Sequence, residues 1–283
     1  MDSILLYLGL AAVLVYGAWG LVLLFMQPKL LYRPIRDVVF TPADRDLVYE
    51  DAVFQSSDGL KLTGWHIPAP DARFTVLFCH GNGGNIMHAL DAVGLFHEIG
   101  LSCLVFDYRG YGNSEGRPSE AGTYLDVRAA FDWLTQVKRI PAERIILCGR
   151  SLGGAVAAHL AGETRPAALA VEGAFTSYPD IGAWFYPYMP VRQFARFRYD
   201  TLAHIKRARC PVMVVHSKDD ELVPPDFGRR LFEAAGEPKE FVEIAGSHND
   251  GFLFSAGRYK QAWTRWLASL KAGELQSTVS RAR

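Results

Sequence analysis

The chain has 283 residues, with 30 Lys and Arg side chains balanced by 30 Asp and Glu side chains. This length allows one large α/β domain or two small ones, and the balanced charge lacks the basic character expected of a nucleic-acid-binding protein. The hydrophobic content of 49% fits a sizeable globular core plus one further apolar segment.

That apolar segment covers residues 4–26, which include no charged side chain. A helix needs about 20 residues to cross a bilayer. A cleaved signal peptide is the alternative. It calls for a basic start, a shorter apolar core and a small-residue cleavage site, and none of these is clear in the sequence. We therefore predict a retained single-pass anchor at residues 1–28. Because Lys29, Arg33 and Arg36 follow the segment, the positive-inside rule places the rest of the chain in the cytoplasm.

Beyond the anchor, β-rich runs alternate with amphipathic stretches. Residues 49–55 and 61–67 flank the turn sequence SSDG and predict an antiparallel hairpin. Further strands are predicted at 75–79, 102–106, 144–148, 168–172, 212–216 and 241–245. Helices are predicted at 86–99, 120–138, 152–161, 226–235 and 256–270. This alternation predicts an α/β fold at residues 29–272, with a mostly parallel sheet covered on both faces.

The four cysteines are Cys79, Cys103, Cys148 and Cys210, and they lie in or beside the predicted strands. No pair has the spacing of a zinc site or of a redox C-x-x-C motif. We expect free, mostly buried thiols that behave as small apolar residues. The sequence calls for no metal and no organic cofactor.

The sequence GRSLGG at residues 149–154 stands between a predicted strand and a predicted helix. This is G-x-S-x-G in the strand–turn–helix context in which the serine stands exposed above a sheet. Ser151 is therefore the predicted nucleophile. It needs a base, and His248 is the best candidate because it follows the last predicted strand.

Several carboxylates could orient the imidazole of this histidine. Asp219, Asp220 and Glu221 all follow the predicted strand 212–216, and Glu172 ends the strand before it. Asp219 and Glu221 are expected to face solvent or to pair with Lys218. Residue types alone leave Asp220 and Glu172 as rivals.

The loop HGNGGN at residues 80–85 follows one strand and precedes a helix. Acyl transfer needs N–H donors aimed at the developing oxyanion, and the backbone N–H groups of Asn82 and Leu152 are the predicted pair. A phosphate cradle is the alternative for a glycine-rich loop, although this loop lacks the lysine of a P-loop. The loop 107–116, with Asp107 and Arg109, is interpreted as scaffold around the site.

Together, HGNGGN, DYRGYGNSEG, GRSLGG, HSKDDELVP and GSHND resemble the α/β-hydrolase superfamily over residues 49–270. Within it, the chain is similar to small membrane-anchored serine hydrolases related to serine aminopeptidase-like and acyl-thioesterase enzymes. The resemblance implies the α/β-hydrolase fold, and it places the triad acid on Asp220 and the base on His248. Ser217 departs from the pattern, which usually has glycine there.

The resemblance also implies a cap insertion, placed at residues 173–209, which are rich in aromatic and basic side chains. An apolar cap favours a small-molecule or lipid-like acyl substrate. The predicted reaction is hydrolysis of an acyl ester or thioester through an acyl-enzyme. Amide or peptide hydrolysis by the same residues and a non-catalytic binding role remain alternatives, whereas dehalogenation would need a carboxylate in place of Ser151. The polar tail at 273–283 is predicted to be disordered.

Overall fold

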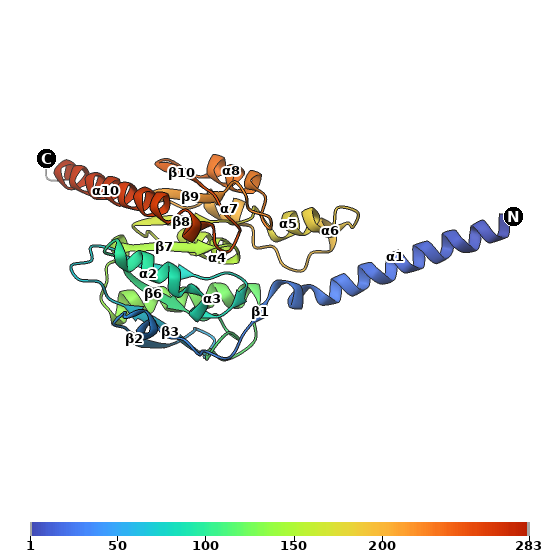
Figure 1. Ribbon diagram of the computed structural model, residues 1–283, viewed down its shortest axis with the longest axis horizontal. Coiled ribbons are helices and arrows are strands. Elements are labelled where there is room, and N and C mark those ends of the chain that lie inside the picture. The colour runs from blue at the N-terminus through green and yellow to red at the C-terminus, as the bar shows by residue number, and fades with distance from the viewer. Residues whose placement is uncertain (1, 282–283) are drawn as a thin grey trace.

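The central sheet of the protein has eight strands in the order β10-β9-β8-β7-β4-β6-β3-β2. The structure is a computed structural model, and it describes the backbone of residues 2–281 and the side chains of residues 3–270 (Figure 1). The strands are β2 Glu50–Gln55, β3 Lys61–Ile67, β4 Thr75–Cys79, β6 Ser102–Phe106, β7 Ile145–Arg150, β8 Ala168–Glu172, β9 Val212–Ser217 and β10 Lys239–Ile244. β3 is antiparallel to β2 and β6, and the other pairs are parallel. The predicted hairpin and mostly parallel sheet are confirmed.

Helices cover both faces of this sheet. The helices α2 Leu90–Glu98 and α10 Ala256–Arg281 contribute to one apolar cluster, and α3 Glu120–Asp132, α4 Leu152–Ala161 and α8 Pro225–Ala234 contribute to the other. Short helical turns complete the layers: η1 Pro42–Arg45, η2 Ile86–Ala89, η3 Trp133–Val137, η4 Ala142–Arg144 and α9 Gly251–Phe254.

The inner strands are apolar on both faces because both faces are covered. All five side chains of β4 are buried. Since successive side chains of a strand point to opposite faces, Val76 and Phe78 join the cluster under α2 and α10, while Leu77 and Cys79 join the cluster under α3 and α4. Cys79, Cys103 and Cys148 are buried free thiols, as predicted, and Cys210 is partly buried.

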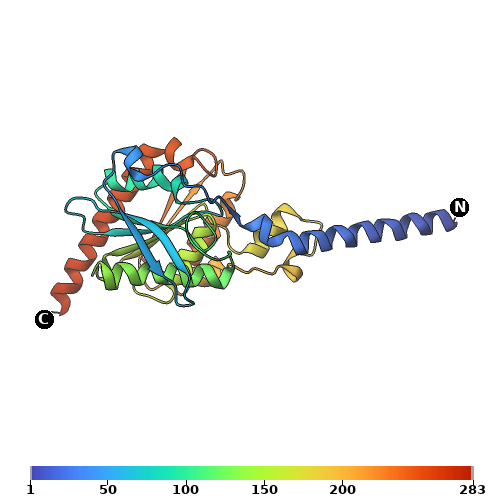
Figure 2. The ribbon, with the colours of Figure 1, turned by 90° about the horizontal axis from the view of Figure 1, so that it is seen from below.

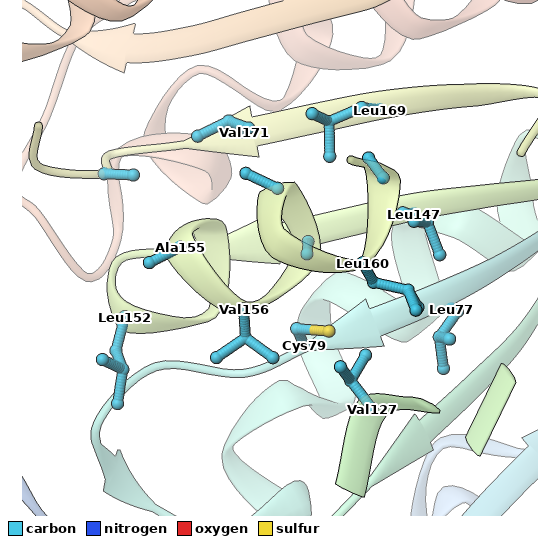
Figure 3. Packing of buried hydrophobic residues seen from close by; sticks show 14 of the residues in the cluster. Leu77, Cys79, Val127, Leu147, Leu152, Ala155, Val156, Leu160, Leu169 and Val171 are labelled. Atoms are coloured by element: carbon cyan, nitrogen blue, oxygen red, sulfur yellow. The ribbon is translucent and has the colours of Figure 1, made fainter. Parts of the chain in front are cut away.

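The helix α4 packs closely on the sheet (Figure 3). Val156 and Leu160 of α4 lie beside Cys79 and Leu77 of β4. The approach is closest at Gly153, where an added Cβ would lie 2.0 Å from the carbonyl oxygen of Cys79. The helix after the predicted nucleophile therefore rests directly on the strand before the loop 80–85.

The predicted insertion at 173–209 contains three helices, α5 Tyr178–Phe185, α6 Val191–Phe194 and α7 Thr201–Ile205. Of these three helices, only α5 and α6 project from the domain (Figure 1). α7 packs against α4, and Thr201, His204 and Ile205 are buried. The projecting cap is therefore shorter than the sequence predicted, because the buried face of α7 belongs to the helical layer.

The N-terminal helix α1 spans Asp2–Leu31 and projects away from the α/β domain (Figures 1 and 2). Its segment Ser3–Leu31 is long and apolar enough to cross a membrane. It is followed by the short strand β1 Arg33–Pro34, which pairs in parallel with β5 Gly83–Gly84. No motif or periodicity in the sequence indicates this pairing.

The prediction that the tail is disordered is wrong over residues 273–281, because α10 continues to Arg281. Most residues in KAGELQS, which continues from Leu270, favour helix, and the preceding turns are anchored by the buried side chains of Trp263, Trp266 and Leu270. Residues 282–283 lie outside the described part of the chain.

We predict that Gly153→Ala destabilises the protein, because its Cβ would collide with the carbonyl of Cys79. Such overpacking against backbone should cost about 3 kcal/mol or more and lower Tm by on the order of 10 °C. The matched control is Gly94→Ala in α2, where an added Cβ meets nothing within 4 Å. Thermal unfolding of both variants should separate them, and equal Tm values would contradict the packing argument.

Candidate active site

The turn between β7 and α4 holds Ser151 in a rare backbone conformation. Its φ of 54° and ψ of −119° are costly for a residue with a side chain. The backbone N–H of Ser151 donates to the carbonyl of Glu172 at 2.8 Å. A Cβ on Gly149 would lie 2.0 Å from the carbonyl oxygen of Gly153, so the turn needs glycine there. The surrounding packing thus maintains a strained serine.

The side chain of His248 lies against Asp220. Its Nδ1 is 2.7 Å from Oδ2 of Asp220. The other oxygen, Oδ1, accepts N–H bonds from Leu222 at 3.0 Å and from Val223 at 2.7 Å. Burial acts to raise the pKa of Asp220, but the hydrogen bonds from His248 and Val223 outweigh it and hold this pKa below its usual value. An ionised Asp220 selects the tautomer with a proton on Nδ1, which leaves Nε2 as an acceptor.

Ser151 and His248 line one cavity of about 730 Å³. The loop 80–85 also lines it, and Gly81 faces the turn: an added Cβ there would lie 3.7 Å from Cβ of Ser151. The remaining walls are largely apolar and include Phe78, Leu152, Phe175, Ile181, Phe185, Leu222, Phe252 and Leu253.

The rival carboxylates have other partners. Glu172 pairs with Arg150 at 2.8 Å and accepts the hydroxyl of Tyr259 at 2.5 Å. Asp219 accepts the backbone N–H of Gly246 at 3.1 Å, and Glu221 accepts that of His248 at 3.0 Å. Asp219 and Glu221 are exposed, as predicted, and each also accepts an N–H from the loop that carries the histidine.

His216, which precedes Asp220 in the chain, contacts the same acid. Its Nε2 lies 2.8 Å from the carbonyl oxygen of Val223 and 3.6 Å from Oδ2 of Asp220. Burial lowers the pKa of His216, which favours a neutral ring that donates from Nε2 to Val223. The sequence signal is its position at the end of β9, four residues before Asp220.

The end of α1 reaches the loop 80–85, a contact that no sequence pattern indicates. Nδ2 of Asn82 donates to the carbonyl of Leu31 at 2.8 Å. The carbonyl of Asn82 accepts the N–H of Arg33 at 3.0 Å and the hydroxyl of Tyr111 at 2.8 Å. Leu30, Leu31 and Arg33 line the cavity. The residue predicted to supply an oxyanion donor is thus braced by the segment that follows the apolar helix.

The loop 107–116 is tied down by buried charges, in keeping with its predicted scaffold role. Arg109 pairs with Asp126 at 2.8 Å and with Asp58 at 2.7 Å. Oδ1 of Asp107 accepts the N–H of Ile86 at 2.9 Å. Within the part of the chain whose side chains are described, no three His, Cys, Asp or Glu side chains gather as a metal site.

A family model for the α/β-hydrolase fold matches residues 75–191. An Arabidopsis thaliana protein described as α/β-hydrolase domain-containing is 36% identical, over 85% of this chain and 89% of its own. A Saccharomyces cerevisiae protein described as a membrane protein is 31% identical, over 80% and 84%. The structure of a Pyrococcus furiosus esterase superposes with a TM-score of 0.70 at 23% identity, over 84% and 98%; at that identity the likeness shows the fold.

The stability of the protein should depend on the ionisation of Asp107. Burial raises the pKa of its carboxyl from 3.8 to about 7. Between these values the unfolded chain releases the proton and the folded chain keeps it, so the free energy of unfolding falls as pH rises through this window. The loss should be roughly 2–4 kcal/mol.

Asp107→Asn removes this titration, while His80, whose Nε2 lies 3.7 Å from Oδ1 of Asp107, is present in both proteins. The wild type should lose stability relative to the variant from pH 4.5 to pH 7 and then level off. Urea unfolding across this range measures the difference, and a difference independent of pH would contradict the prediction.

Proposed function

Because the chain belongs to the α/β-hydrolase family, we propose that it is a membrane-anchored serine hydrolase that cleaves acyl esters or thioesters. The observation that carries the proposal is the strained Ser151, which lines the same cavity as a histidine whose Nδ1 is 2.7 Å from Asp220. An ordinary strand–helix turn needs neither the strain nor the paired acid and base.

In this mechanism Oγ of Ser151 attacks the acyl carbon while Nε2 of His248 takes its proton. Asp220 orients the ring and stabilises its positive charge. The backbone N–H groups of Asn82 and Leu152 bind the oxyanion. The bond to the leaving oxygen or sulfur breaks as His248 returns the proton to that atom. Water, deprotonated by His248, then attacks the acyl-serine, and the carboxylic acid and the free serine form.

The apolar cavity walls favour an acyl group as the bound part of the substrate. An amidase or peptidase would use the same residues, and its leaving nitrogen would take the proton from His248. p-Nitrophenyl esters of graded chain length, assayed beside thioesters and aminoacyl amides, distinguish these classes by kcat/KM.

Membrane attachment is proposed through α1, which has the length and hydropathy of a membrane span. The yeast relative described as a membrane protein supports this assignment. The cations that follow the apolar run, Lys29, Arg33 and Arg36, favour a cytoplasmic α/β domain.

Labelling by a fluorophosphonate probe tests the enzyme proposal against a non-catalytic binding role. The folded wild type should react covalently at Ser151, and Ser151→Ala should lose all labelling because it has no nucleophile. Gel fluorescence with mass spectrometry of the labelled peptide is the measurement. An unlabelled wild type, or equal labelling of the variant, would defeat the proposal.

The assignment of the acid is tested by Asp220→Asn and Glu172→Gln. The first change removes the charge that orients His248 and should lower kcat by about a hundredfold or more. The second removes a charge that pairs with Arg150. Measured on the folded fraction of the Glu172→Gln protein, kcat should fall far less. Esterase kinetics beside circular dichroism measure both effects, and the reverse order would mean that Glu172 is the acid.

A further inference from the structure

The cap carries a cluster of exposed apolar side chains, here named the cap tip. Trp184 and Phe185 end α5 with 57% and 52% of their surfaces exposed. Tyr188 follows in the linker at 89%, and Phe194 ends α6 at 60%. Clustered exposed aromatic residues of this size mark an interaction surface in a soluble domain.

The cap tip lies beside α1 (Figures 1 and 2). The hydroxyl of Tyr16 donates to the carbonyl of Tyr188 at 2.5 Å. Near the end of the helix, Nε2 of Gln27 donates to the carbonyl of Phe194 at 3.1 Å, and Oε1 of Gln27 accepts the N–H of Arg196 at 2.7 Å. The cap tip therefore runs along α1 from the level of Gln27 to the level of Tyr16.

These levels give a depth relative to a membrane. A bilayer core about 30 Å thick takes about 20 residues of helix, so a span that starts at Ile4 ends between residues 23 and 26. Tyr16 then lies seven to ten residues inside the span, or about 10–15 Å along the helix axis. A bilayer around α1 would thus surround Tyr188 as well.

Charged side chains lie where this geometry places the headgroups. Arg196 is exposed at the level of Gln27, and Lys29 and Arg33 are exposed just beyond it. Aromatic residues on the apolar side with cations at the boundary are typical of segments that rest in a membrane interface. None of the side chains in the most apolar window of α1 is buried, so they remain available to lipid.

The cavity of Ser151 extends to this same place. Leu30 and Leu31 of α1 and Phe185 of α5 line it. Because Phe185 is also half exposed within the cap tip, the apolar wall of the cavity is continuous with the surface that faces the proposed bilayer.

We propose that the cap tip is embedded in the leaflet around α1, and that the substrate is an acylated amphiphile resident in that leaflet. Its acyl chain enters the cavity between α1 and α5 without crossing water. The substrate class rests on the proposed hydrolysis at Ser151, whereas the embedding rests on the contacts between α1 and the cap.

The embedding is tested with full-length protein in phosphatidylcholine vesicles whose acyl chains are brominated, because bromine quenches tryptophan on contact. The emission of Trp184 is the difference between wild type and Trp184→Phe. We expect the emission of Trp184 to be at least twofold lower in brominated vesicles than in plain vesicles. Trp19 lies within α1, so its emission should be quenched in the same way in both proteins. Equal Trp184 emission in both vesicle types would overturn the embedding.

The substrate class is tested by the ratio of two rates: hydrolysis of a long-chain fluorogenic ester held in vesicles, and hydrolysis of water-soluble p-nitrophenyl butyrate. The double variant Trp184→Asp, Phe194→Asp changes side chains that do not line the cavity of Ser151. It should lower the ratio at least tenfold, because charged residues are expelled from the leaflet.

The control is Val137→Asp, which places one such charge on a side chain 63% exposed at the end of η3, between α3 and β7. It should leave the ratio as in the wild type. A double variant with the wild-type ratio would overturn the proposed substrate class while soluble esterase activity still upholds the proposed function. A wild type inactive on both esters would overturn the proposed function itself.

Discussion

The close contact between α4 and the strands beneath it is the constraint on which the site depends. A Cβ on Gly153 would lie 2.0 Å from the carbonyl oxygen of Cys79, and one on Gly149 would lie 2.0 Å from the carbonyl oxygen of Gly153. Because glycine leaves no side chain at these two positions, helix and strands come close enough to hold Ser151 at a φ of 54°. The strain is sustained because the surrounding packing is nearly complete, with nine of the ten α4 residues buried.

Three carboxylates lie around the turn that carries Ser151, and each of them binds a different partner. Asp220 binds His248, Glu172 binds Arg150, and Glu221 binds the backbone of the histidine loop. The pKa of Asp220 stays low despite its burial because hydrogen bonds offset the desolvation. The segments that follow β8, β9 and β10 are thereby held in place around one cavity.

The apolar helix α1 is coupled to this cavity as well as to the proposed membrane. The carbonyl of Leu31 and the N–H of Arg33 bind the side chain and the carbonyl of Asn82, and β1 pairs with β5 in the same loop. The segment 31–34 therefore both follows the proposed membrane anchor and holds the loop 80–85 in place. A change in the position of α1 would reach Asn82 through two hydrogen bonds rather than through the body of the domain.

The sequence by itself determined most of the strand and helix ranges and the G-x-S-x-G turn around Ser151, because burial periodicity and turn chemistry are local properties. Residue types alone left Glu172 as a rival of Asp220 for the acid, and the predicted cap extended over α7. Only the tertiary structure shows that His248 contacts Asp220 whereas Glu172 pairs with Arg150, and that α7 packs against α4, since each contact depends on which distant strand ends and helices meet. The pairing of residues 33–34 with residues 83–84 was likewise decided by the tertiary structure, in which β1 and β5 form a two-stranded sheet of their own.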